Sequence, residues 1–232
     1  MRGSAGERLG LAPGSSLDFH DYREYQPGDD LRRLDWSVYA RSDKEIVKLF
    51  QEEVSPKLEI ILDTSRSMDM PGTAKADTTR TLCAALSSAA ANARCTCAVF
   101  EFDSDISIIS SPTPFRRNSI RVLISDLMFD TPPENILRRL RDHAAALTVI
   151  QPLTDSETNP RPSGSVRLDD IETSETLDLT LDETACAAYR SALASHRENW
   201  NRECRRCGAT FIPLNADILD LTPLVRAGIL EP

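Results

Sequence analysis

Residues 58–68 read LEIILDTSRSM, an apolar run followed by a polar turn. The run Leu58–Leu62 is typical of a strand buried on both faces of a parallel sheet, and the Ala-rich segment 73–94 that follows it predicts a helix. The polar residues in between therefore lie at a strand-to-helix turn. In open α/β sheets, ligands bind at this edge, beyond the carboxyl ends of the strands.

Strand and helix patterns alternate along the rest of the chain, which predicts an α/β fold: a three-layer, mostly parallel, doubly wound, Rossmann-like sheet. Further strands are expected at 97–102, 106–110, 121–124, 147–151 and 210–214, and a small flanking hairpin at 166–168 and 177–179. Helices are expected at 183–207 and 217–226, and a third is expected to open with a capping box at Thr131 and Glu134 and to run to about residue 146.

The segment that precedes this domain has a different character. Between Leu17 and Glu53, charges of both signs alternate with aromatic residues, which indicates a folded arm held by ion pairs. Alternatively, this arm has only a structural role. Within it, residues 36–41 and 45–50 predict a β-hairpin. The expected organisation is a flexible N-terminus at 1–16, an arm at 17–56 and an α/β domain at 57–232.

Composition limits the function. The 232 residues are 41% hydrophobic, which suits one α/β domain with a real core. A net charge of -9, from 36 acids and 27 bases, disfavours nucleic acid and anionic membranes as partners. No stretch approaches the roughly 20 apolar residues of a membrane helix, and residues 1–14 lack the apolar core of a secretory signal. We therefore expect a cytoplasmic protein without membrane insertion.

Two acidic loops follow predicted strands. Asp63, Ser65 and Ser67 supply a carboxylate and two hydroxyls at one strand exit, and Asp126 follows the strand 121–124. Mg²⁺ prefers about six oxygens in near-octahedral array. We expect a Mg²⁺ or Mn²⁺ site that is short of ligands and leaves room for water or for an acidic side chain of a protein partner. Alternatively, Asp63 caps the next helix and the serines satisfy backbone groups.

A family resemblance rests on these residues. Asp63, Ser65 and Ser67 resemble the Asp-x-Ser-x-Ser motif of the metal-ion-dependent adhesion site (MIDAS) in von Willebrand factor type A domains. Residues 22–36, YREYQPGDDLRRLDW, with Ala40 and Arg41, closely resemble the hallmark of the bacterial family catalogued as domain of unknown function fifty-eight, whose members look like type A domains with an N-terminal extension. The resemblance covers about residues 17–153 well and the remainder loosely.

The resemblance implies a noncatalytic, magnesium-dependent interaction domain. Members of the family are commonly paired with MoxR-type AAA+ ATPases and are thought to act with them in the maturation or assembly of other proteins. In the family, a threonine that ligates the ion lies before the strand that ends in Ser-Asp. Here that segment, 111–120, is short and holds Thr113 as its sole threonine. The site is therefore expected to be weakened, with the threonine position filled by Thr113, by water or by nothing.

Other chemistries fit less well. A magnesium-dependent phosphotransferase of the haloacid dehalogenase type would use Asp63 as nucleophile and Asp126 with Asp130 for the ion, but Ser65 stands where its general acid would be. A Ser-His-Asp hydrolase lacks its Gly-x-Ser-x-Gly elbow, and no glycine-rich phosphate loop is present. If an ATPase is involved, we expect it to be another polypeptide.

The six cysteines are expected to be reduced thiols, since they lack the dense spacing of a secreted domain that is held together by disulfides. Cys204 and Cys207 form a CxxC, and Cys95 with Cys97 forms a CxC, so a zinc site is an alternative. We favour the interpretation in which Cys204 continues the apolar stripe of the helix 183–207.

Overall fold

The computed structural model describes residues 17–52, 56–103, 114–169 and 176–230. The chain divides between Ser55 and Pro56 into two compact units, an N-terminal arm and an α/β domain. The expected flexible N-terminus and the expected strand at 106–110 lie outside the described residues, as does Thr113.

The arm is built on an antiparallel pair of strands. β1 (Leu17–Glu24) pairs with β2 (Ile46–Glu52), with a register shift between Phe19 and Asp21. The short 3₁₀-helix η1 (Leu31–Arg33) and the helix α1 (Trp36–Ser42) lie between these strands in sequence.

Helix α1 shows that one prediction was wrong. Residues 36–41 were expected to form the first strand of a hairpin with 45–50, but they are helical, and β2 pairs with β1 instead. The carboxylate of Asp35 caps the helix by accepting the amides of Ser37 at 3.0 Å and Val38 at 3.3 Å. Asp43 ends it in the left-handed conformation, with φ 56°. These local caps outweigh the β propensity of the Trp, Val and Tyr side chains, which depends on context.

The second unit is a parallel sheet of five strands in the order β4-β3-β5-β6-β9, which confirms the predicted mostly parallel fold. Its strands are β3 (Lys57–Asp63), β4 (Thr96–Phe102), β5 (Ile120–Ile124), β6 (Ala146–Leu153) and β9 (Thr210–Asn215). The antiparallel pair β7 (Gly164–Asp169) and β8 (Thr176–Leu181) is the predicted flanking hairpin.

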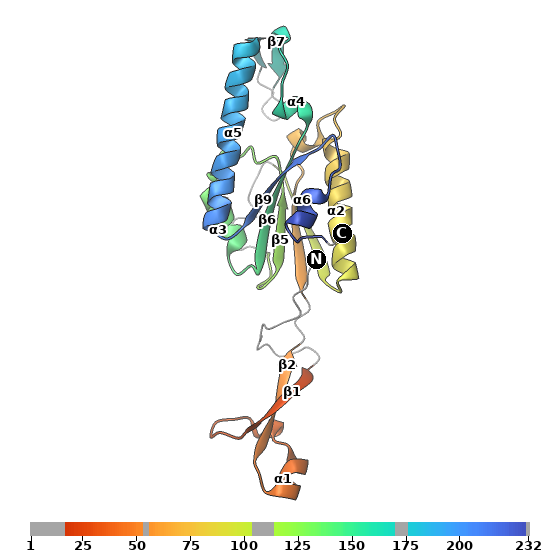
Figure 1. The fold of residues 1–232 in the computed structure, drawn as a ribbon, viewed down its shortest axis with the longest axis vertical. Coiled ribbons are helices and arrows are strands. Elements are labelled where there is room, and N and C mark those ends of the chain that lie inside the picture. The colour runs from red at the N-terminus through yellow and green to blue at the C-terminus, as the bar shows by residue number, and fades with distance from the viewer. Residues whose placement is uncertain (1–16, 53–55, 104–113, 170–175, 231–232) are drawn as a thin grey trace. The chain divides into compact units, whose positions relative to one another are not determined.

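Helices cover both faces of this sheet (Figure 1). On one face, α2 (Lys75–Asn92) and α6 (Thr222–Arg226) pack on alternate strand residues such as Ile60. On the other face, α3 (Pro133–Arg141) and α5 (Glu183–Arg206) pack on the residues in between, such as Ile61. Successive side chains of a strand point to opposite faces, so the near-continuous apolar strands fill both cores.

Two helix boundaries differ from the predictions. Helix α3 begins after Pro132 without a side-chain cap, so the capping box expected at Thr131 is absent there. It ends at Arg141, because His143 is left-handed with φ 52° and β6 begins at Ala146. Helix α6 spans only residues 222–226, since residues 217–221 form a turn and loop.

The strand order places a switch point at the centre of the sheet. From β3 the chain passes through α2 to β4 on one side, while β5 pairs with the other side of β3. In open α/β sheets, ligands bind outside the carboxyl ends of the strands where the order reverses. Here those ends are Asp63 and the residues that follow Ile124.

Candidate functional site at the edge of the parallel sheet

Asp63 is the last residue of β3, and its side chain is only 3% exposed. Its Oδ1 accepts the Ser65 amide at 3.0 Å, and its Oδ2 accepts the hydroxyl of Ser125 at 2.6 Å. Burial raises the pKa of Asp63, as does the nearby charge of Asp126, while the hydrogen bonds oppose the rise. Asp63 does not cap α2, which begins twelve residues later; it orders its own loop and links that loop to β5.

The two serines of the motif lie side by side. Ser65 precedes the 3₁₀-helix η2 (Arg66–Asp69) but makes no side-chain cap to it. Its Oγ lies 3.1 Å from the Oγ of Ser67. The neighbouring Thr64 anchors the loop, since its amide and its hydroxyl both donate to the carbonyl of Phe102 at the end of β4. The hydroxyls thus lie together on a loop that is tied to two adjacent strands.

The loop after β5 is held in an uncommon conformation. Leu127 is fully buried and left-handed, with φ 67°, which bulky side chains rarely adopt. Its amide donates to the Ser125 Oγ at 2.9 Å, and the carbonyl of Asp126 accepts Nε2 of buried Gln151 at 2.8 Å. Such strain persists where the surroundings enforce it and is concentrated at binding sites and active sites. The loop therefore holds Asp126 in a fixed position.

The carboxylate of Asp126 is paired with a lysine. Lys75, the first residue of α2, is completely buried; its ammonium donates to Asp126 Oδ2 at 3.0 Å and to Glu157 Oε1 at 2.8 Å. Burial alone would lower the pKa of Lys75, but the charges of Asp126 and Glu157 outweigh it, and the pKa is raised. Asp126 is thus already charge-compensated by the protein itself.

Glu157 is fixed by its own helix. It lies in α4 (Asp155–Thr158), and its Oε2 accepts the amide of Thr154 at 2.7 Å, while the Thr154 hydroxyl caps the Glu157 amide. This reciprocal arrangement is a capping box. Three separate elements, α2, the β5 loop and α4, therefore meet at the ammonium of Lys75.

The metal ligands predicted from the sequence offer only carboxylate and hydroxyl oxygens, which are the ligand atoms that a hard divalent cation prefers. The loop of Asp63, Ser65 and Ser67 is tied directly to β5 through Ser125, and Asp126 is the next residue. No group of three or more His, Cys, Asp or Glu side chains suited to a metal lies within the described residues. A cation at this edge would therefore depend on the serine hydroxyls and would share Asp126 with Lys75.

Sequence reasoning missed Lys75, Glu157 and the bridging role of Ser125. For Lys75 a signal was present: it stands four residues before Thr79 and seven before Leu82, on the stripe of α2 that faces the core. A lysine on a buried stripe requires an acidic partner. For Glu157, the sequence from Thr154 to Glu157 has the Thr-x-x-Glu pattern of a capping box, but nothing in that pattern pointed to Lys75.

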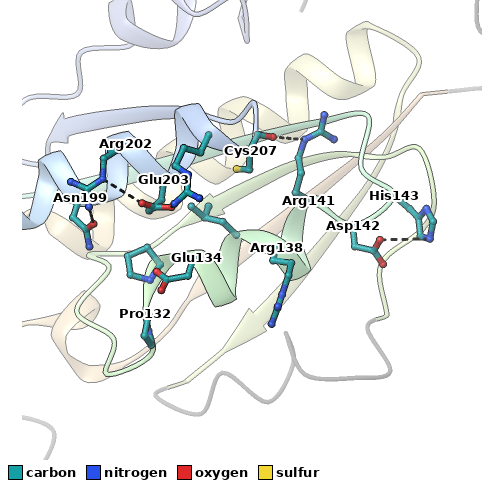
Figure 2. A pocket seen from close by; sticks show the side chains of 13 residues that line it. Pro132, Glu134, Arg138, Arg141, Asp142, His143, Asn199, Arg202, Glu203 and Cys207 are labelled. Atoms are coloured by element: carbon teal, nitrogen blue, oxygen red, sulfur yellow. Dashed lines mark hydrogen bonds and ion pairs between the residues drawn. The ribbon is translucent and has the colours of Figure 1, made fainter.

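A cleft of about 1110 Å³ lies away from this edge, between α3 and α5 (Figure 2). Arg138, Arg141, Arg202 and Arg206 line it, but Arg202 and Arg206 pair with Glu203 of the same helix. Arg141 donates to the carbonyl of Cys207 at 3.1 Å and so joins the ends of the two helices. The arginines of α5 are thus engaged within their own helix and Arg141 has a structural role, so the sheet edge remains the stronger candidate.

The cysteines of the CxxC and the CxC are free thiols. Cys204 is fully buried in the core formed with Trp200, and Cys207 packs against the same core. Burial raises the pKa of the Cys204 thiol to about 12. The structure thus agrees with Cys204 as a core residue.

None of the helices in the described residues combines the length and the hydrophobicity that a membrane span requires.

Comparisons with known proteins give a family without a known activity. Residues 21–113 match the profile of the family described as protein of unknown function DUF58. The uncharacterized protein Rv1480 of Mycobacterium tuberculosis is 29% identical over 262 residues, covering 95% of this chain and 81% of that protein. The uncharacterized protein MAV169 of Mycobacterium avium is 33% identical over 119 residues, covering 49% of this chain and 69% of that protein.

Among solved structures, the crystal structure of conserved hypothetical protein BatB from Bacteroides thetaiotaomicron aligns with a TM-score of 0.43 and 10% identity. The alignment covers 75% of this chain and 97% of that one.

Proposed function

The chain belongs to DUF58, a family of proteins of unknown function, and we propose that it is a noncatalytic, divalent-cation-dependent protein-protein interaction domain of the von Willebrand factor type A kind. In this proposal it acts in the cytoplasm as an adaptor that works with a MoxR-type AAA+ ATPase in protein maturation or complex assembly. The partner presents an acidic side chain to the edge of the parallel sheet.

One observation carries the proposal. The oxygen-bearing loop of Asp63, Ser65 and Ser67 and the loop of Ser125 and Asp126 are joined at the switch point of the sheet by the 2.6 Å hydrogen bond between Ser125 and Asp63. A structural turn does not need two hydroxyls 3.1 Å apart beside a buried carboxylate. Oxygen-only donors at this edge are the set that Mg²⁺ or Mn²⁺ takes in proteins.

The residues that would hold the ion are Asp63, Ser65, Ser67 and Asp126. A bound Mg²⁺ or Mn²⁺ would supply a positive charge with open coordination positions, which a carboxylate of the partner can fill. The protein's own part is to keep the hydroxyls together and to hold Asp126 still, which the anchored Thr64 and the enforced backbone of Leu127 achieve.

Noncatalytic binding is favoured over phosphoryl transfer. A phosphotransferase of the haloacid dehalogenase type carries its general acid two residues after the nucleophilic aspartate. Here Ser65 stands at that position, and a serine hydroxyl is too weak an acid for this role. Phosphatase activity of the purified protein that Asp63→Asn abolishes would contradict the noncatalytic proposal.

A capture experiment tests the function. The tagged protein is incubated with lysate of its native cell in Mg²⁺ or in chelator, and bound proteins are identified by mass spectrometry. We expect an AAA+ ATPase or a client protein to be retained only with Mg²⁺ and to be lost with Ser65→Ala. The matched control is Ser88→Ala, which removes an exposed hydroxyl of α2. Retention of the same proteins in chelator, and by Ser65→Ala, would contradict the proposal.

A further inference from the structure

Lys75 occupies a position that is unfavourable for a lysine unless acidic partners are fixed beside it. It is the first residue of α2, where the helix dipole presents its positive end and acidic residues are preferred. Its side chain is nevertheless completely buried. Two carboxylates, those of Asp126 and Glu157, compensate this charge at 3.0 and 2.8 Å.

In the proposed site, Asp126 would interact with two cations. A divalent ion beside Ser65 and Ser67 would gain from the charge of Asp126, but that charge already compensates Lys75. A buried ammonium cannot turn to water when Asp126 is shared, since none of its side chain is exposed. An incoming ion has to offset this loss, and its affinity is lowered accordingly.

We infer that Lys75 is an internal counter-ion that competes with the divalent cation for Asp126 and sets the site to bind its ion weakly until a partner adds a carboxylate. This inference rests on the proposed function and specifies its regulation. Glu157 is the second partner: it binds the ammonium from the α4 side and would remain paired with it when Asp126 is shared.

Calorimetric titration with Mn²⁺ tests the inference in the full chain. Lys75→Met is expected to bind Mn²⁺ about tenfold or more tightly than the wild type, because one unit charge near a divalent ion is removed from a poorly solvated site. Lys75→Met with Glu157→Gln keeps the net charge of the wild type but leaves Asp126 unpaired, and it is also expected to bind more tightly. The control Arg80→Met removes an exposed charge from the same helix and is expected to leave the Mn²⁺ affinity unchanged.

The double variant also guards against misfolding, because it leaves only the carboxylate of Asp126 unpaired, whereas Lys75→Met also leaves the half-buried carboxylate of Glu157 without its cation. Wild-type binding that neither Lys75 variant strengthens overturns the inference and leaves the proposed cation site standing. Binding by the Lys75 variants but not by the wild type supports the competition and overturns the cation dependence of the native protein. Binding by no variant overturns both.

Discussion

Three buried or half-buried charged side chains meet at Lys75, and each is held by a different element. Taking an ion pair out of water costs several kcal/mol per ion, which is recovered only where hydrogen bonds satisfy the remaining donors and acceptors. Here Asp126 also accepts the amide of Met128 at 3.3 Å, and Glu157 accepts the amide of Thr154. The cluster is therefore sensitive to the loss of any one member.

Substitution of Lys75 should have a large effect on stability. Lys75→Met is expected to lower the free energy of unfolding by about 3–5 kcal/mol, because buried Asp126 and half-buried Glu157 would lose their cation. Arg80→Met, on the exposed face of α2, should cost no more than about 1 kcal/mol. Urea denaturation followed by circular dichroism measures both. A loss for Lys75→Met no larger than that for Arg80→Met would show that the pair contributes little.

At the scale of elements, α1 depends on its N-cap. Asp35 accepts the Ser37 hydroxyl and the Val38 amide and pairs with Lys48 at 3.2 Å, although it is buried. The hydrogen bond from the Ser37 side chain is the largest cause that lowers the pKa of Asp35; burial opposes it, and the contact with Lys48 adds to it. A carboxyl with a lowered folded-state pKa stabilises the fold above its unfolded pKa, and this contribution is lost as the pH falls through the folded value.

The helix should therefore loosen in acid. We expect protection of the Tyr39 amide, which donates to the Asp35 carbonyl at 3.0 Å, to hold at about pH 6 and to decline below about pH 4, the ordinary range for Asp. Hydrogen exchange followed by NMR gives the protection factor at each pH. In Asp35→Asn, the protection factor of the Tyr39 amide should be lower than in the wild type at neutral pH and should not change with pH. An equally steep decline in that variant would assign the acid sensitivity to other groups.

A second buried pair connects β3 to β5. Arg121 donates to Glu59 at 3.1 Å and to the carbonyls of Leu140 and Asp142 at the end of α3. Both side chains of the pair are 2% exposed. Arg121 therefore joins β3 and β5 to the C-terminal end of α3. A cation is favourable at this end of a helix.

Removal of Arg121 should be costly. Arg121→Met is expected to destabilise the domain by about 3–5 kcal/mol, since Glu59 would remain buried and unpaired. Arg167→Met, which breaks an exposed pair with Asp178 between β7 and β8, should cost about 1 kcal/mol or less. Thermal unfolding of the two variants under the same conditions compares them. Similar melting temperatures would contradict the central role of Arg121.

At the scale of the whole molecule, the α/β domain has cores on both faces of its sheet, which are filled by its own helices. Residues 56–232 expressed alone are therefore expected to fold, to unfold in one cooperative transition and to keep the far-ultraviolet circular dichroism of an α/β protein. The full chain is the reference. A broad transition, or one shifted down by more than about 10 °C, would show that the domain depends on the arm.

Much of this architecture was predictable from the sequence, because the spacing of apolar residues along the chain indicates which side chains are buried. The apolar runs that became β3, β5 and β6 are buried on both faces, so their pattern indicated strands without ambiguity. Helix α1 was not predictable in this way, since Trp36, Val38 and Tyr39 favour strands and only the cap at Asp35 decides against them. Asp63 and Asp126 could be placed at one sheet edge from topology, whereas Glu157 enters only through tertiary contact.

Anomalous diffraction from crystals of the full chain soaked in Mn²⁺ tests the proposed cation site directly. We expect a manganese peak at the carboxyl ends of β3 and β5, with the hydroxyls of Ser65 and Ser67 as ligands at about 2.0–2.2 Å, the distance range of small divalent ions bound by oxygen. We also expect a stronger peak in crystals of Lys75→Met. Absence of a peak at this edge in both crystals, with Lys75 of the wild type still paired to Asp126, would rule out a cation site there.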